Sequence, residues 1–274
     1  MTITMPGGAA ANAVLTRNNV SVLGADTAPT MIFGHGYGTS KQMWRLVAPQ
    51  FADDHRVVLF DHVGSGDSDQ AAYDASKYDS LYGYADDLLE IAHALDLHDI
   101  VFVGHSVSAM IGALAAIAEP ELFASLILVG PSPRYINDSD YVGGFEAADV
   151  DALLDSLDAN YLGWASTMAP VFMGNAERPE LAAELVDSFA KADPAVASQF
   201  ARVTFLSDVR AELPNVTTPT LIVQSTDDIV APVIVGEYLK GAIAGSELVV
   251  LEADGHYVHL ANPGKLSDTI RAFL

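Results

Sequence analysis

The fold of this chain is decided by residues 100–108, IVFVGHSVS, together with the run that follows, AMIGALAAIA (109–118). The four apolar residues at the start predict a buried strand, and the small residues after Ser108 predict a helix. Only a sharp turn fits between the two, so the residues two before and two after Ser106 must be small. Gly104 meets this condition, and Ser108 also does, although glycine is more usual there. A serine on such a strand-turn-helix elbow is a candidate nucleophile.

Further apolar runs of similar length occur on both sides of this stretch. Continuous runs of this kind are typical of strands that are covered on both faces, as in a parallel sheet. Between them lie helical patterns such as 86–95, and the alternation predicts an α/β, doubly wound sheet flanked by helices. Residues 13–17 and 20–23, split by Asn18-Asn19, predict an antiparallel hairpin that leads into the sheet. The other predicted strands are 31–33, 57–60, 126–129, 221–223 and 248–251.

The alternation stops after Pro131, and from there to Pro214 the pattern is helical. The clearest amphipathic stretches are 149–157 and 179–192, and Asp193-Pro194 predicts a helix start with the aspartate as its cap. The chain is therefore divided into a core, residues 1–132 and 215–274, and an inserted helical lid, residues 133–214. Ligands of open α/β sheets bind at the carboxyl ends of the strands, so an insertion at that edge would roof the pocket.

A serine hydroxyl needs a base within hydrogen-bond reach and an acid that orients the base. Behind an elbow of this kind the order along the chain is serine, acid, histidine. Of the eight histidines, only His256 and His259 follow the last predicted strand. His256 comes directly after Asp254-Gly255, in the loop at the strand end, and is the predicted base. His259 is expected to pack against or cap the helix behind it.

The acid should stand at the end of the preceding strand, where two aspartates compete. Asp227 and Asp228 both follow the run 221–226. The D-x-x-x-P spacing from Asp228 to Pro232 places a helix start just after the loop and favours Asp228. Asp227 would then point to solvent.

An oxyanion hole needs two backbone N–H groups directed at the developing charge. One is predicted at Val107, the residue after the nucleophile. The other is predicted at Tyr37, in the loop 34–38, GHGYG, that follows the strand at 31–33. The alternative for this loop is an ordinary flexible turn.

Large apolar side chains recur in the insertion and could make a substrate pocket apolar. The alternative is that they only pack helix against helix. The candidates are Phe145, Tyr161, Trp164, Met168 and Phe172.

Composition excludes several classes of protein. A formal net charge of −23 repels phosphate backbones and anionic lipid heads, so neither a nucleic-acid partner nor a membrane surface is expected. The chain has no cysteine, which excludes disulfides and thiolate chemistry, and neither a metal nor another cofactor is expected. The loop 64–68, GSGDS, lacks the lysine of a phosphate-binding loop. Residues 1–13 lack a secretory signal pattern and no run is long enough to span a membrane, so a cytoplasmic location is expected.

Several segments resemble the RsbQ group, which comprises the bacterial stress-response regulator RsbQ and the plant strigolactone and karrikin receptors. The resemblance extends from Val14 across the insertion. The segments that carry it are VGHSVSAM (103–110), FDHVGSG (60–66), GPSPR (130–134), YVGGFE (141–146), NYLGW (160–164) and PVIVGEY (232–238).

This resemblance implies an α/β-hydrolase fold with a four-helix lid over a hydrophobic pocket. It implies a catalytic triad of Ser106, Asp228 and His256, with Tyr37 and Val107 as oxyanion donors. One departure is Asp227, where plant members tend to carry lysine, which alters the local charge but not the triad.

The expected function is that of a serine hydrolase acting on a small hydrophobic ester or lactone. The alternative is a signalling or ligand-sensing protein in which hydrolysis is slow or secondary and, as the resemblance to RsbQ implies, the partner is a PAS-containing phosphatase. Carbon–carbon or nitrile-lyase chemistry on the same triad is a third possibility in this fold. A serine nucleophile argues against dehalogenase and epoxide-hydrolase chemistry, which need an aspartate in its place.

Overall fold

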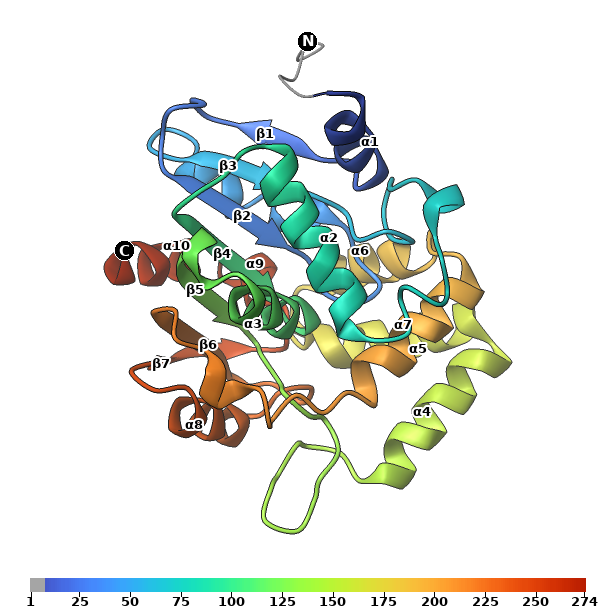
Figure 1. Ribbon diagram of the computed structural model, residues 1–274. Coiled ribbons are helices and arrows are strands. Elements are labelled where there is room, and N and C mark those ends of the chain that lie inside the picture. The colour runs from blue at the N-terminus through green and yellow to red at the C-terminus, as the bar shows by residue number, and fades with distance from the viewer. Residues whose placement is uncertain (1–7) are drawn as a thin grey trace.

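A computed structural model of the protein describes residues 8–274. The segment 1–13, in which no secretory signal is expected, therefore lies partly outside the described residues. The described chain forms a seven-stranded sheet in the order β1-β3-β2-β4-β5-β6-β7 (Figure 1). β1 pairs antiparallel with β3, and every other pair is parallel. The predicted strands from 31–33 onward are all confirmed. The strands are β1 (Ser21–Leu23), β2 (Thr30–Gly34), β3 (Arg56–Leu59), β4 (Ile100–His105), β5 (Phe123–Val129), β6 (Thr220–Asp227) and β7 (Glu247–Asp254).

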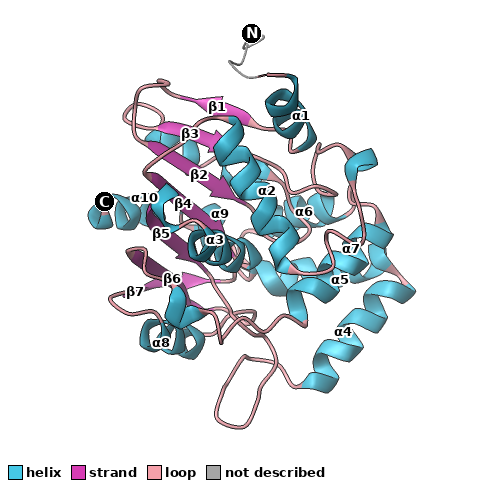
Figure 2. Cartoon of the chain, viewed as in Figure 1, coloured by secondary structure: helices cyan, strands magenta, loops and turns pink. Residues whose placement is uncertain are grey.

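Helices cover both faces of the sheet, as the continuous apolar strands require (Figure 2). Along β2, Ile32 packs with one apolar cluster, whereas Met31 and Phe33 pack with the other. One cluster includes the helices α2 (Leu81–Ala94), α3 (Val107–Ala118) and α8 (Val233–Ala242). The other includes the 3-10 helices Lys41–Trp44 and Ala48–Phe51 with α9 (Val258–Ala261) and α10 (Pro263–Phe273). Further single-turn 3-10 helices are Gln70–Ala72, Pro120–Leu122 and Leu213–Asn215.

Four helices lie between β5 and β6 along the chain, as expected from the loss of strand patterns after Pro131. They are α4 (Ala147–Ala159), α5 (Tyr161–Met173), α6 (Pro179–Phe189) and α7 (Pro194–Phe205). The predicted cap of α7 is confirmed, because the Asp193 carboxylate accepts hydrogen bonds from the backbone N–H groups of Ala195 and Val196. Figure 1 shows the four helices beyond the carboxyl ends of the parallel strands.

The predicted hairpin at residues 13–23 is wrong. Residues Ala9–Arg17 form the helix α1, which is capped by Asn18 and followed by Asn19 in the left-handed region (φ 45°). The alanine-rich run 9–13 extends the segment into a good helix former, and Arg17 anchors it by ion pairs to Asp87 (2.9 Å) and Glu90 (2.5 Å) of α2. β1 therefore finds its partner in β3 rather than in the preceding residues.

No helix within residues 8–274 is long and apolar enough to cross a membrane.

Candidate active site

Ser106 stands on a strained turn between β4 and α3. Its backbone lies at φ 57° and ψ −122°, a region that residues other than glycine rarely adopt. The turn is held because the Ser106 N–H donates to the Val129 carbonyl (2.8 Å). It is also crowded, since a Cβ on Gly104 would lie 2.6 Å from the Ser108 carbonyl oxygen. Backbone strain that the surrounding structure enforces at a single residue is typical of functional sites.

The serine that replaces glycine at position 108 has a specific environment. Its hydroxyl donates to the His35 carbonyl (2.5 Å) and lies 2.7 Å from Nε2 of His62. Because the single hydroxyl proton goes to the carbonyl, the imidazole must donate to the serine oxygen. Ser108 therefore links the elbow to the loops after β2 and β3. Sequence reasoning missed His62, although the segment 60–66 was among those that carry the resemblance.

The structure brings together His256 and Asp228. Nδ1 of His256 lies 2.7 Å from one carboxylate oxygen of Asp228, and both side chains are buried. The other carboxylate oxygen accepts the N–H groups of Val230 (2.8 Å) and Ala231 (3.0 Å), which fixes the orientation of the carboxylate. Asp227 is exposed to solvent. Of the two competing aspartates, Asp228 is the one that contacts the histidine.

The elbow at Ser106 and the loop that carries His256 both lie beside residues 129 and 130, at the end of β5. Ser106 is bonded to Val129, and a Cβ on the adjacent Gly130 would lie 3.1 Å from the His256 ring. Within the described residues, Nε2 of His256 is buried and has no hydrogen-bond partner, so the structure shows no hydrogen bond between it and the Ser106 hydroxyl. The Ser106 hydroxyl lies 3.4 Å from that of Tyr135. Sequence reasoning missed Tyr135, whose only signal was its place just after β5.

The two candidate oxyanion donors flank the elbow. Val107 opens α3, and the first N–H groups of a helix have no partner within it. A Cβ on Gly36 would lie 3.4 Å from the Ser106 Cβ, so the loop that carries Tyr37 runs beside Ser106. The Tyr37 side chain points away from this backbone and donates to the Ala197 carbonyl in α7 (3.1 Å).

The five candidate pocket residues of the insertion do not form one group. Three of them, Phe145, Trp164 and Met168, line a cavity of about 540 Å³ between α4 and α5 whose lining does not include Ser106. Tyr161 and Phe172 are buried and pack against Trp164, with ring centroids 6.0 and 6.2 Å away. The Trp164 Nε1–H group is buried and has no partner within the described residues. Tyr161 and Phe172 therefore pack within the insertion, whereas Trp164 both packs against them and lines the cavity.

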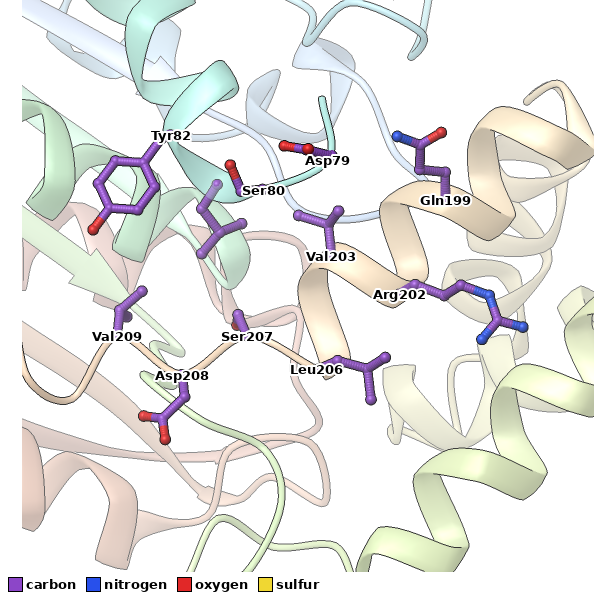
Figure 3. A pocket seen from close by; sticks show the side chains of 11 residues that line it. Asp79, Ser80, Tyr82, Gln199, Arg202, Val203, Leu206, Ser207, Asp208 and Val209 are labelled. Carbon is purple, nitrogen blue, oxygen red and sulfur yellow. The ribbon is translucent and has the colours of Figure 1, made fainter. Parts of the chain in front are cut away.

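A second cavity, of about 410 Å³, lies where the insertion meets the core. Figure 3 shows Tyr82, from the first turn of α2, on one side and Val203 and Leu206, from the end of α7, on the other. The Tyr82 hydroxyl donates to Glu212 (3.1 Å). None of the predicted site residues lines this cavity, so it stands apart from the candidate active site.

Residues 29–263 match the family model described as alpha/beta hydrolase fold. That span includes every strand of the sheet except β1, the elbow, the insertion and the His256 loop. The chain belongs to the α/β-hydrolase family. Membership confirms the fold class predicted from the alternation of strands and helices.

Relatives of the hydrolase match it over most of their length. It is 38% identical over 263 residues to "Strigolactone esterase D14" of Arabidopsis thaliana (95% of this chain, 97% of the relative). It is 38% identical over 247 residues to "Karrikin insensitive 2 receptor CA" of Petunia hybrida (90% and 91%). The solved structure of olei00960, a hydrolase from Oleispira antarctica, matches with a TM-score of 0.93 and 39% identity (96% of each chain). The resemblance to the strigolactone and karrikin receptor group is confirmed.

Four histidines of the hydrolase are buried around the site without being part of the predicted triad. Burial lowers the pKa of His35, and lowers those of His62 and His105 well below the ordinary value. Burial likewise lowers the pKa of His259 to about 3. The His259 ring packs on Trp44, with centroids 4.6 Å apart, and neither of its nitrogens has a partner within the described residues. All four therefore stay neutral in the folded state at neutral pH.

These histidines predict a steep loss of stability in mild acid. Their pKa values are lower in the folded than in the unfolded state, so the unfolded state binds more protons below about pH 6.5. The folded state therefore has its full stability above that pH, and the free energy of unfolding decreases as the pH falls. With four groups the free energy of unfolding should drop by up to about 5 kcal/mol per pH unit. Urea unfolding from about pH 8 to about pH 4 measures the slope.

His259→Phe is the matched control for this prediction. Phenylalanine keeps the ring on Trp44 and takes up no proton, so the slope should fall by about 1.4 kcal/mol per pH unit. Equal slopes in the two proteins, or a stability that stays flat down to about pH 5, would contradict the prediction.

Proposed function

We propose that this protein is a serine hydrolase that cleaves small hydrophobic carboxylic esters or lactones. The observation that carries the proposal is the buried pair of His256 and Asp228, 2.7 Å apart, at the sheet edge where Ser106 stands on its strained elbow. Nucleophile, base and orienting acid in this arrangement support acyl transfer.

In the proposed reaction the Ser106 oxygen attacks the substrate carbonyl while Nε2 of His256 takes the hydroxyl proton. The negative charge that develops on the carbonyl oxygen is stabilised by the backbone N–H groups of Tyr37 and Val107. Collapse breaks the bond to the alcohol, which leaves with the proton from His256 and, in a lactone, stays attached to the acyl chain. Water then attacks the acyl-enzyme, His256 takes its proton and returns it to Ser106, and the acid is released.

Asp228 has a single task in this scheme. Its carboxylate accepts the Nδ1–H of His256 and so leaves the lone pair on Nε2, facing the nucleophile. The two backbone N–H groups that donate to its other oxygen hold the carboxylate in place.

We further propose that residues 133–214 act as a lid over the core, residues 1–132 and 215–274. The helices α4 to α7 lie beyond the carboxyl ends of the strands, and Tyr37 packs against Trp164, Phe189, Phe200 and Phe205 of the insertion. A roof of this composition excludes water from the site and selects an apolar substrate over a charged one.

Trp164 tests the proposed lid. Trp164→Phe removes the unpartnered Nε1–H and narrows the ring, so the preference among acyl-chain lengths should shift while the melting temperature changes little. Trp164→Ala should shift the preference too and should also cost about 3–5 kcal/mol of stability, because the ring packs among four other aromatic rings. Turnover of p-nitrophenyl esters of increasing length and urea unfolding measure the two effects. An unchanged preference in both variants would show that Trp164 serves packing alone.

The proposed function is tested by a panel of neutral esters and butenolides, run beside charged esters of similar size. Turnover of the neutral compounds should be higher, because the expected pocket is apolar. Labelling with a fluorophosphonate, followed by mass spectrometry, should place the modification on Ser106 in the active protein. No turnover of any ester or lactone, together with no labelling of Ser106, would overturn the proposal.

A second candidate function is ligand sensing, favoured by the similarity to a relative named as a karrikin insensitive 2 receptor. In this proposal hydrolysis is slow and the bound ligand changes the lid that a partner contacts; the resemblance to RsbQ suggests a PAS-containing phosphatase as that partner. A butenolide that raises the melting temperature of the Ser106→Ala variant and promotes binding of such a phosphatase supports sensing. Fast turnover with no effect of ligand on partner binding supports the enzyme instead.

A further inference from the structure

The loop that carries the proposed base is packed directly against the end of α5. The His256 N–H donates to the Phe172 carbonyl, 2.9 Å away. Gly255 has a φ of 82°, and a Cβ there would lie 1.8 Å from the Met173 carbonyl oxygen. Only glycine fits so close to another backbone. The base is thus supported by the insertion as well as by the sheet.

Asn175 and Asp254 join these two segments. The Asn175 N–H donates to the Asp254 carboxylate (2.7 Å), and the Asn175 amide donates to the backbone carbonyls of Asp254 (2.7 Å) and Met173 (2.9 Å). Asn175 is buried and lies in the left-handed region, φ 53°. Asparagine suits that backbone better than most side chains. One residue therefore satisfies acceptors on both segments at the turn between α5 and α6.

Arg178 completes the connection. Its guanidinium donates to the Ala261 carbonyl beyond the base loop (2.9 Å) and to the Asn175 side-chain oxygen. On the opposite side, Nε2 of His105 lies 2.9 Å from the His256 carbonyl. The backbone of the base is thereby held between the residue before the nucleophile and the end of α5.

We propose that Asn175 and Asp254 are positioning residues for His256: they tie the base loop to the α5–α6 turn, so the position of the insertion sets the position of the base. The proposal rests on the proposed function, in which His256 takes the proton of Ser106. Neither residue touches the substrate, so their loss should lower kcat and leave KM nearly unchanged.

The first test compares Asn175→Ala with Asn175→Gly. Both remove the amide that donates to the two carbonyls, but glycine tolerates the positive φ and should keep more of the stability. Both variants should lose about 10- to 100-fold in kcat on p-nitrophenyl acetate, because a displaced base of this kind loses about 100-fold per ångström. KM should stay within about twofold of the wild type.

Asp96→Ala is the matched control for the backbone penalty. Asp96 also lies in the left-handed region, φ 52°, and its side chain is 97% exposed. It precedes the amino end of β4, whereas Ser106 follows the carboxyl end of that strand. This variant should be destabilised without a change in kcat. A conservative pair completes the series: Asp254→Asn keeps an acceptor for the Asn175 N–H and should retain activity, whereas Asp254→Ala should fall to the level of Asn175→Gly.

A spectroscopic measurement tests the position of the base without turnover. The Nδ1–H proton between His256 and Asp228 should give a downfield ¹H NMR signal in the wild type and in Asp254→Asn. The signal should be weakened or shifted in Asn175→Gly and Asp254→Ala. An unchanged signal and an unchanged kcat in these two variants would overturn the positioning role and leave the proposed function intact. An inactive wild type without labelling of Ser106 would instead overturn the proposed function. The NMR signal alone would then show whether Asn175 and Asp254 hold His256 in position.

Discussion

Ser106→Ala should lower kcat/KM on p-nitrophenyl acetate by about 10⁴-fold or more and leave the fold intact. The hydroxyl is the only proposed nucleophile, and its removal leaves only the binding and oxyanion contributions of the site. The alanine occupies the same turn, with the same backbone hydrogen bond to Val129. Steady-state kinetics and circular dichroism measure the two parts of this prediction. Turnover near the wild-type level would end the assignment of the nucleophile.

Ser106→Gly separates the chemical role of this residue from its backbone strain. It removes the same hydroxyl, so activity should fall as far as in Ser106→Ala. Glycine adopts φ 57° without steric cost, so this variant should be more stable than Ser106→Ala, by about 1 kcal/mol. Urea unfolding of the two inactive variants measures the difference. Equal stabilities would show that the elbow stores no strain at this residue.

Asp228→Asn should lower kcat by about 10⁴-fold, whereas Asp227→Asn should have little effect. The side-chain oxygen of the asparagine must face the N–H groups of Val230 and Ala231, because the amide NH₂ cannot accept from them. The NH₂ then faces Nδ1 of His256, which must become the acceptor, and the imidazole proton moves to Nε2. A base that already carries a proton toward Ser106 cannot take another.

Asp227→Asn is the matched control, since it makes the same change at the adjacent, exposed carboxylate. The spacing to Pro232 and the contact with His256 both favour Asp228. A loss of activity that is equal in the two variants, or larger at position 227, would show that the acid has been misplaced. Comparing kcat and KM for each variant, with melting temperatures, distinguishes this outcome from simple unfolding.

Much of the core could be predicted from the sequence, because each of its strands contains a short apolar run between turn residues. The elbow was readable for the same reason: Gly104, Ser106 and the run 109–118 impose a strand, a turn and a helix with little help from the rest of the chain. The helix cap at Asp193 could also be predicted, because its hydrogen bonds go to residues only two and three positions further along the chain. The hairpin at residues 13–23 was wrong, because ion pairs from Arg17 to α2 and pairing of β1 with β3 are long-range interactions that a local pattern does not contain.

The order of serine, acid and histidine along the chain was enough to nominate Ser106, Asp228 and His256, since in this topology each follows a particular strand. Which groups surround them was decided only in three dimensions. The Tyr135 hydroxyl lies 3.4 Å from that of Ser106, and Asn175 donates to Asp254, 79 positions away in the sequence. Neither residue belongs to a motif, because a hydrogen bond between two distant loops needs a particular distance and direction but no particular spacing in sequence. The sequence by itself determined the sheet and predicted the candidate residues at its edge, and only the tertiary structure placed the α5–α6 turn against the loop that carries His256.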